Sequence, residues 1–501
     1  MPDAIVIGAG PNGLVAANHL ADAGWSVEVL EAQSRPGGAV KSSEFVEPGF
    51  VNDEFSAFYP LAAASPAMTG LELERWGLEW AHGPLALAHP ATDGSCAVLS
   101  RDLDETAASL DAFAPGDGDA WRELFAWWAR VGDPFLHALA TPFPPVRAGL
   151  RLAARLRREL PEFARFATLS VRRLADERFT GEGGGRLIAG NAMHTDLLPE
   201  SAIGGFFGWF LCCLGQTVGY PCARGGASSL TDALVRRLEA KGGRVTCDAR
   251  VHEIVVERGR ARAVRSAAGD LSAGKAILAD VHAVPLYLDL LPRSAVPARV
   301  LSAIERFEHD PATYKVDWTL DGPIPWAVDD VRRAPVVHVA ESVDELSLTQ
   351  AEIARGQRPH NPFLVMGQYS MADPSRMPAG KEVAWAYTHL PHRASTDGLA
   401  DRMEERVEAL APGFRALVRN RRISEPADLE AADENLQGGS LSGGTSQLHQ
   451  QLVFRPIAGL GRPETPVKGL YLASSSAHPG GGVHGCPGAI AAKAALHRRF
   501  R

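Results

Sequence analysis

Short apolar runs and helical periodicity alternate at the start of the chain. Ala4 to Ile7 is an apolar run rich in β-branched residues, which is typical of a buried parallel strand. Leu14 to Ala23 then has the spacing of a helix and is followed by Gly24, a residue that commonly ends helices. Ser26 to Leu30 indicates a second strand. The pattern predicts a strand, a helix and a parallel strand.

Comparable patterns recur further along the chain. Near the middle we expect a helix, several strands and a hairpin at Leu230 to Ala240, Arg244 to Ala249, Val251 to Val256, Arg260 to Val264 and Lys275 to Leu278. A later set predicts four strands and a helix at Tyr314 to Leu320, Val336 to Val339, Phe363 to Tyr369, Glu382 to His389 and Met403 to Leu410. Gly469 to Ala473 and Ala489 to Leu496 predict a closing strand and helix.

Helical patterns and aromatic residues dominate the stretch from Pro66 to about Leu214. Gly70 to Trp80 and Asp119 to Leu139 predict helices. Trp121, Phe125 and Trp128 recur at helical spacing. A core-facing stripe is the favoured interpretation of these rings, and the lining of an apolar substrate channel is the alternative.

The turn between the first strand and helix carries candidate chemistry. It reads Gly8-Ala9-Gly10-Pro11-Asn12-Gly13, with Glu31 at the end of the second strand. Glycines at these positions permit the tight turn, the approach of backbone to a pyrophosphate, and close packing of helix on strand. The helix N-terminus favours a phosphate, and the carboxylate accepts hydrogen bonds from ribose hydroxyls while repelling a 2′-phosphate. The unit therefore predicts a dinucleotide site, which this motif alone does not assign to FAD or NAD.

The residues after Glu31 favour FAD. Arg35-Pro36-Gly37-Gly38-Ala39 forms a short loop that can return to the diphosphate, where arginine supplies charge and the glycines permit close approach. This combination resembles the flavoprotein pattern of the amine oxidase and phytoene desaturase superfamily; an ordinary Pro-Gly turn is the alternative.

The other end of the chain carries a second glycine-rich turn. After the closing strand, Ser474-Ser475-Ser476-Ala477-His478-Pro479-Gly480-Gly481-Gly482-Val483-His484 leads into the last helix. Such a turn directs backbone N–H groups at negative charge, as on a reduced flavin. The string resembles the closing motif of the phytoene desaturase family. It is especially similar to the branch named pyridine nucleotide-disulfide oxidoreductase domain proteins.

That resemblance implies an architecture. The fold class is α/β, with a two-part Rossmann-like FAD-binding domain (residues 1–65, 220–290 and 440–501). A discontinuous α+β substrate domain comprises the helical insertion 66–219 and the mixed segment 291–439. The residues implied to hold FAD are Gly8, Gly10, Pro11, Asn12, Gly13, Glu31, Arg35, Gly37, Gly38, Ala39, Val251, Ser475, Gly480, Gly481, Gly482 and Val483. Residues near Asp280 are implied to return toward the flavin.

The family also implies a reaction: hydride transfer from a C–C bond of a small apolar substrate to flavin N5. By motif, His478 and His484 are the nearest candidate bases, and a structural role in the glycine loop is the alternative for both. A desaturase or dehydrogenase of a lipophilic or natural-product substrate is favoured. A flavin oxidase of an amine or alcohol, or an FAD-binding isomerase or interaction protein, remains open. Because the chain shows no second nucleotide loop, oxygen or a quinone is the expected electron acceptor.

Composition narrows the setting. The formal net charge of −8 gives no support for nucleic-acid binding. The six cysteines form no CxxC pair and the histidines no HExxH or HxxxH pattern, so we expect no metal site and a reduced, cytoplasmic location. No apolar run reaches the 18 residues of a membrane span.

One basic segment stands apart. Residues 147–173 contain eight arginines and two glutamates, with Arg147, Arg151, Arg155 and Arg158 on one face of a predicted helix. Peripheral contact with an anionic membrane is one interpretation, and a solvated surface helix is the other.

Overall fold

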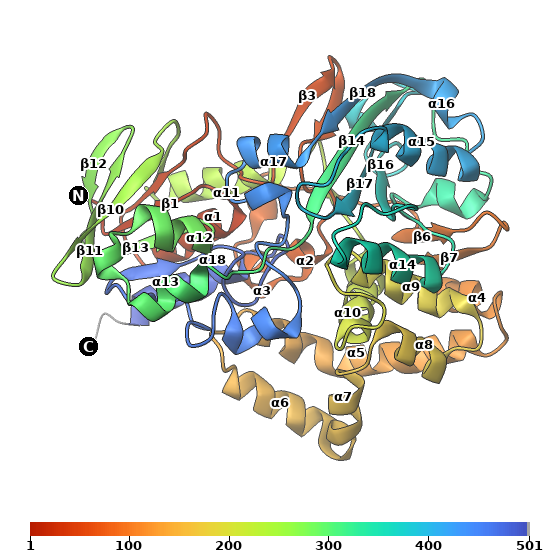
Figure 1. Ribbon diagram of the computed structural model, residues 1–501, viewed down its shortest axis with the longest axis horizontal. Helices are drawn as coiled ribbons and strands as arrows, with labels where there is room; N and C mark the ends of the chain where they lie inside the picture. Colours follow the sequence, from red (N-terminus) through yellow and green to blue (C-terminus); the bar gives the residue numbers. More distant parts are fainter. Residues whose placement is uncertain (498–501) are drawn as a thin grey trace.

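Five short strands from three distant stretches of the chain form one parallel sheet in the computed structural model, which describes residues 1–497 (Figure 1). Residues 498–501 of the predicted FAD-binding domain lie outside this range. The strand order is β19-β13-β1-β2-β9, all parallel: Leu470–Leu472, Ala276–Ala279, Ala4–Ile7, Val27–Leu30 and Arg244–Thr246. The short apolar runs at both chain ends thus pair into one sheet through β13.

Alternating residues of β1 explain how this sheet is covered. Val6 faces a core shared with the helices α1 (Pro11–Asp22), α11 (Ser228–Ala240) and α18 (Cys486–His497). Ile5 and Ile7 face the opposite core, formed with a three-stranded antiparallel sheet and helix α13. Those elements are β10 (Val251–Glu257), β11 (Arg260–Ser266), β12 (Gly269–Ser272) and α13 (Ala298–Ile304). Both faces are buried, which is why the strands are apolar without alternation.

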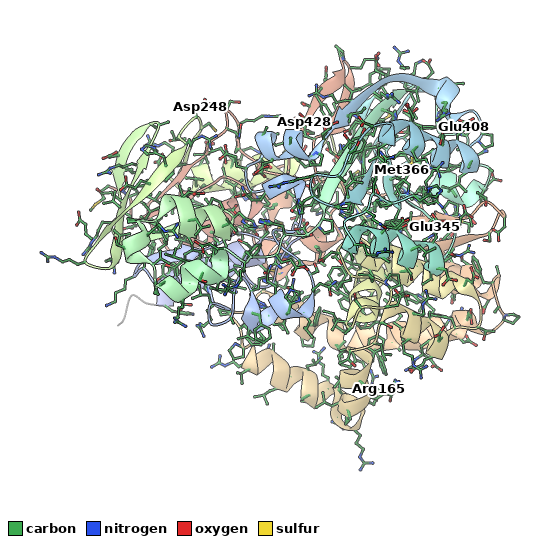
Figure 2. The ribbon with its side chains drawn as sticks, in the orientation of Figure 1. Arg165, Asp248, Glu345, Met366, Glu408 and Asp428 are labelled. Atoms are coloured by element: carbon green, nitrogen blue, oxygen red, sulfur yellow. The ribbon has the colours of Figure 1, made fainter. Side chains whose placement is uncertain are left out.

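A second, seven-stranded sheet forms the other lobe, drawn at the right in Figure 1. Its order is β18-β14-β17-β16-β15-β6-β7: Val418–Ser424, Ala312–Leu320, Glu382–Leu390, Leu364–Gln368, Val336–Val339, Leu87–Pro90 and Cys96–Leu99. Met366 on β16, labelled in Figure 2, packs in the outer core with α15 (Leu399–Leu410) and α16 (Phe414–Leu417). Trp385 on β17 packs in the inner core with the helical layer.

The helical layer lies below this sheet in Figure 1. Its helices are α4 (Leu103–Asp111), α5 (Asp117–Leu139), α6 (Val146–Leu156), α7 (Leu160–Phe166), α8 (Val171–Arg178), α9 (Glu182–Ala192) and α10 (Gly204–Val218). Trp121 and Trp128 are buried in its core. The remaining elements are β3 (Ser42–Glu47), β4 (Phe50–Asp53), β5 (Trp80–Ala81), β8 (Cys222–Ala223), α2 (Pro60–Ala64), α3 (Pro66–Thr69), α12 (Ala283–Pro285), α14 (Val343–Ala354), α17 (Pro426–Ala432) and short 3₁₀ or π turns.

Segment 66–219 is less helical than its description as a helical insertion implies. It contributes β5, and its strands β6 and β7 extend the seven-stranded sheet. The predicted helix at Gly70 to Trp80 is wrong: only a 3₁₀ turn forms at Leu73–Trp76, because Glu72 and Gly77 take left-handed backbone conformations at its two ends (φ 51° and 92°). The predicted helix at Asp119 to Leu139 is confirmed within α5.

The basic segment is not one helix. Arg157 has a left-handed φ of 49°, so the chain turns after α6, passes through a 3₁₀ turn at Arg157–Glu159 and restarts as α7 with Pro161 in its first turn. Arg158 therefore leaves the face that the predicted continuous helix gives it. No helix among residues 1–497 combines the length and apolar character needed to cross a bilayer.

Candidate active site

The first glycine turn is built by contacts between backbone atoms. Gly8 has φ +93°, and a Cβ at this position would stand 2.6 Å from the carbonyl oxygen of Asp280. At Gly13 a Cβ would stand 2.2 Å from the carbonyl oxygen of Gly8. These separations are too short for any side chain, so the turn and the first turn of α1 require glycine here.

The second glycine loop rests on the first. The Gly37 N–H donates to the Ala9 carbonyl oxygen at 2.9 Å, and a Cβ on Gly38 would stand 3.0 Å from Gly10 Cα. Both Gly37 and Gly38 have positive φ, 126° and 53°. The structure thus brings together Gly8, Gly10, Gly13, Gly37 and Gly38 as one backbone-lined cradle, with Pro11 and Asn12 opening α1 beside it.

Glu31 is held in a fixed orientation at the end of β2. Its Oε2 accepts from the Ala9 N–H at 2.7 Å, and its Oε1 accepts from the Gln33 N–H at 2.9 Å. The Ala249 N–H donates to the Glu31 carbonyl oxygen at 2.8 Å. This bond places the start of β10, and hence Val251, near Glu31 at the edge of the parallel sheet. Each carboxylate oxygen keeps a further lone pair for a ribose hydroxyl.

Arg35 makes other contacts. Its guanidinium donates to the Ser42 carbonyl oxygen at 3.0 Å and forms an ion pair with Glu54. The side chain is 44% exposed. A role for Arg35 at the diphosphate stays a prediction, and Ala39, whose carbonyl oxygen accepts from the Ser56 hydroxyl at 2.6 Å, continues the loop past the cradle.

The closing loop reaches the same cradle from the other end of the chain. A Cβ at Gly488 in α18 would stand 1.9 Å from the carbonyl oxygen of Asn12, so α18 packs directly on the start of α1. At Gly481 a Cβ would stand 2.6 Å from the Ser442 carbonyl oxygen, and Gly480 and Gly482 have φ +120° and +103°. Val483 packs in the core that includes α1 and α18. The two ends of the chain therefore pack against each other beside the glycine turn.

The two candidate bases in this loop differ sharply. His484 is tied on both sides: Nε2 lies 3.1 Å from the Gly481 carbonyl oxygen, and Nδ1 accepts from the Cys486 N–H at 3.1 Å. His478 is only 6% exposed, yet neither ring nitrogen has a hydrogen-bond partner within residues 1–497. Its ring meets Phe143 edge-on at 5.7 Å. Burial lowers the pKa of both histidines to about 4, so both are neutral at pH 7.

Comparison with known proteins assigns the chain. A family model described as flavin containing amine oxidoreductase matches residues 12–489. The chain belongs to this family. Pyridine nucleotide-disulfide oxidoreductase domain-containing protein 2 of Rattus norvegicus is 28% identical over 98% of this chain and 92% of its own length. Phytoene desaturase (lycopene-forming) of Pseudescherichia vulneris is 25% identical over 99% of each chain.

Solved structures agree on the fold. Cyclohexylamine oxidase from Brevibacterium oxydans IH-35A superposes with a TM-score of 0.61 at 17% identity, covering 100% of both chains. The predicted fold class and the predicted resemblance are thereby confirmed. This flavin-containing amine oxidoreductase is an FAD-dependent oxidoreductase.

The residues at the cradle fit FAD. The glycine turn leaves the α1 N-terminus open to backbone approach, Glu31 stands where a ribose is expected, and the buried Oδ1 of Asn12 has no partner among the described residues. FAD bound here supplies a hydride acceptor. The chain's own residues supply the backbone cradle, the carboxylate and the closing loop.

Two acids at the cradle, the buried Asp280 and the half-buried Asp433, were missed as site residues in the sequence. Asp280 Oδ2 accepts from the Gly13 N–H at 2.8 Å, and Asp433 Oδ2 would stand 3.3 Å from a Cβ on Gly38. Burial raises the pKa of Asp280 to about 8 and that of Asp433 to about 6. The position of Asp280, directly after β13 at the carboxyl edge of a parallel sheet, is a usable signal. For Asp433, which comes from the segment after α17, we find no such signal.

A buried ion network joins the two lobes beside this site. Arg376 is fully buried and donates to Asp53 Oδ2 at 2.7 Å, to Asp373 Oδ2 at 3.0 Å and to the Ala223 carbonyl oxygen at 2.7 Å. Tyr369 donates to the same oxygen of Asp53 at 2.5 Å. The network links β4 and β8 to the end of β16, and it was not predicted.

Lys315 extends this network onto the inner face of the sheet. Its Nζ lies 2.5 Å from Asp317 Oδ1 and donates to the Asp53 carbonyl oxygen at 2.8 Å. Burial raises the pKa of Asp317 to about 6, against the opposing effect of Lys315. Lys315 and Asp317 are alternate residues of β14. Through Lys315 they contact Asp53, from which the chain leads toward the cradle.

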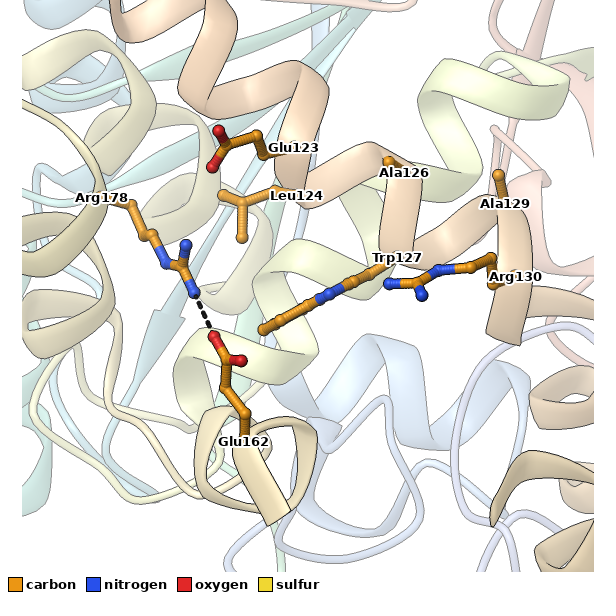
Figure 3. A pocket seen from close by; sticks show the side chains of 8 residues that line it. All are labelled: Glu123, Leu124, Ala126, Trp127, Ala129, Arg130, Glu162 and Arg178. Atoms are coloured by element: carbon orange, nitrogen blue, oxygen red, sulfur yellow. Dashed lines mark hydrogen bonds and ion pairs between the residues drawn. The ribbon is translucent and has the colours of Figure 1, made fainter. Parts of the chain in front are cut away.

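A separate surface hollow of about 560 Å³ lies in the helical layer (Figure 3). It is lined by Glu123, Leu124, Ala126, Trp127, Ala129, Arg130, Glu162 and Arg178. Arg178 lies over the Trp127 ring at 5.3 Å and pairs with Glu162 at 3.4 Å. None of its lining residues belongs to the glycine loops, so we do not assign it to the FAD chemistry.

His194 and Asp196 bond to different segments of the chain. His194 Nε2 lies 2.8 Å from His338 Nε2, whereas Asp196 accepts from Thr445 and from the Ser446 N–H. His194 thus contacts the segment of His338, and Asp196 contacts the segment of Thr445 and Ser446.

Proposed function

We propose that this enzyme desaturates or dehydrogenates a lipophilic or natural-product substrate, with hydride transfer to N5 of the flavin. Several relatives support this reaction class by name: two phytoene desaturases and hydroxyneurosporene desaturase match at 25 to 27% identity over 96 to 99% of this chain. Electrons then leave to oxygen or a quinone. The substrate domain in this proposal comprises 66–219 and 291–439, and 1–65, 220–290 and 440–501 bind FAD.

The observation that carries the proposal is the state of His478. It is a buried imidazole on the loop that includes Gly480 to Gly482, and its two nitrogens have no hydrogen-bond partner among residues 1–497. A neutral imidazole in this position can accept the proton from one carbon of a C–C bond while the other carbon loses a hydride. His484, with both nitrogens engaged, is assigned to holding the loop.

Oxidation of an amine or alcohol is the second candidate. The family description and the fold shared with cyclohexylamine oxidase favour it. A redox-neutral isomerase or an FAD-binding interaction protein is the third.

Anaerobic mixing of the yellow enzyme with polyenes, amines and alcohols separates the three. Bleaching of the flavin by a polyene, with a new C=C bond in the product, supports desaturation. Bleaching only by an amine or alcohol supports the second candidate, and activity only after prior reduction supports the third.

His478→Gln sharpens the same test. For desaturation, we expect the rate of flavin reduction to fall about 100-fold or more, within the usual range for loss of a general base. FAD affinity should be unchanged. A rate within about twofold of wild type would remove His478 from the chemistry.

We also propose a cytoplasmic enzyme that touches a membrane through residues 147–173. Val146 and Leu150 on α6 are 61% and 66% exposed, beside the arginines of the same helix. Exposed apolar residues flanked by cations suit an anionic lipid surface.

A further inference from the structure

A row of rings runs along the inner face of the seven-stranded sheet. Trp385, Tyr387 and His389 are alternate residues of β17, so their side chains share one face. Trp385 and Tyr387 stack at 6.1 Å with an interplanar angle of 7°, and Tyr387 meets His389 at 5.5 Å and 68°. Such a row of rings offers an apolar surface for an extended substrate.

Two polar groups without partners stand at the end of the row. Thr313 of β14 is the direct cross-strand partner of His389. Neither ring nitrogen of His389, nor the hydroxyl of Thr313, has a hydrogen-bond partner anywhere in residues 1–497. The residues are 5% and 1% exposed. Buried polar atoms without partners are costly, and two that adjoin on one face indicate a ligand that bonds to them.

The side chains near His389 and Thr313 indicate which kind of ligand group fits between them. His194 and His338 lie nearby, joined by their Nε2 atoms at 2.8 Å, and His338 Nδ1 is likewise unpartnered among the described residues. Burial lowers the pKa of His194 and His389 to about 4. Neutral imidazoles and a hydroxyl each donate and accept, which matches an alcohol or carbonyl oxygen rather than an ion.

Contacts connect this place to the closing loop. Two residues after His194, Asp196 holds Thr445 and Ser446. The preceding residues of that loop pack on the closing loop: a Cβ on Gly443 would stand 2.3 Å from the Ser475 hydroxyl oxygen. The polar end of the ring row is therefore joined to the proposed FAD site through one loop.

We propose that His389 and Thr313 form a subsite for an uncharged, oxygen-bearing end of an otherwise apolar substrate. Its hydrocarbon body lies along Tyr387 and Trp385. This inference rests on the proposed function and narrows its substrate class to alcohols or carbonyl compounds with a long apolar chain.

The chain offers a matched control. Thr388 is also buried, and its hydroxyl has no hydrogen-bond partner in the described part of the chain, but as the neighbour of His389 on β17 it projects to the opposite face of the sheet. The variants are His389→Phe, which keeps a ring, Thr313→Val, and Thr388→Val as the control. The probes are 3,7,11-trimethyldodecanol and the hydrocarbon 2,6,10-trimethyldodecane, titrated into the FAD-loaded enzyme and followed by the flavin difference spectrum.

We expect wild type to bind the alcohol at least tenfold more tightly than the hydrocarbon. His389→Phe and Thr313→Val should each weaken alcohol binding about tenfold, with hydrocarbon binding within twofold of wild type. Thr388→Val should match wild type. An equal response of wild type to both probes, including none to either, overturns the subsite, as does equal loss in Thr313→Val and Thr388→Val.

The proposed function is tested separately. Flavin reduction by a polyene alcohol without any dependence on His389 overturns the subsite alone. A flavin that no C–C substrate reduces contradicts desaturation, while the binding titration still decides on the subsite.

Discussion

At the cofactor cradle, backbone atoms meet backbone atoms, whereas on the inner face of the seven-stranded sheet long side chains meet one another. In the cradle, Gly13 and Gly488 leave no room for a single methyl group. On the sheet side, Arg376 and Lys315 bond to Asp53 of β4, and Trp385 bonds to Tyr369 beside the neighbouring strand β16. The first region tolerates no added atom. The second depends on pairs of side chains, each of which is costly to break.

The largest expected effect concerns the cradle. In Gly13→Ala, the new methyl group would overlap the Gly8 carbonyl oxygen. We expect FAD binding to weaken about 100-fold and the purified protein to lose its yellow colour. Gly149→Ala in α6, where a Cβ meets nothing within 4 Å, is the control and should stay yellow. A fully loaded Gly13→Ala protein would contradict the close-contact account of the cradle.

The next effect concerns the buried network on the sheet side. Arg376→Leu removes the buried cation that Asp53 and Asp373 share. The free energy of unfolding should fall by about 3–5 kcal/mol. Arg265→Leu, which removes the exposed pair with Glu253, should cost less than about 1 kcal/mol. Urea denaturation of both variants measures the difference, and similar losses would mean that burial does not distinguish these pairs.

A smaller effect tests whether acids in the cradle oppose the diphosphate. Asp280 lies on the Gly13 N–H and faces Asp433 and Glu31, and its raised pKa of about 8 keeps it neutral at pH 7. As the pH rises through 8 the carboxyl ionises and repels the phosphates. FAD affinity should therefore fall about tenfold between pH 7 and 9. Asp280→Asn should remove this dependence in a fluorescence titration with FAD; an identical pH profile in both proteins would exclude Asp280 as the cause.

The smallest effect concerns the surface of the helical layer. With vesicles containing anionic lipid, we expect partial sedimentation at low salt that disappears at high salt, because exposed charges are screened. Leu150→Glu on α6 should reduce the sedimentation. Leu348→Glu, at a different position whose side chain is 67% exposed, should not. Absence of sedimentation at low salt would leave α6 as a solvated helix.

Prediction and structure agree best where the predicted functional residues lie close together in the sequence. The glycine turn, Glu31 and the closing loop were predicted as FAD contacts because each motif depends on neighbours a few residues away, and in the structure the helix after the closing loop packs on the start of α1. His478 and His484 look alike in the sequence. Their difference depends on which carbonyl and N–H groups the folded loop directs at each ring.

The sequence by itself determined the parallel strands, the first helix and the family, because apolar periodicity and glycine spacing reflect steric limits within short segments. Only the tertiary structure decided that Asp433 reaches the cradle, that Arg157 breaks the basic helix, and that His389 and Thr313 stand side by side without hydrogen-bond partners among residues 1–497. Those features come from residues up to hundreds of positions apart, and their energies depend on burial and pairing, which a linear pattern does not contain.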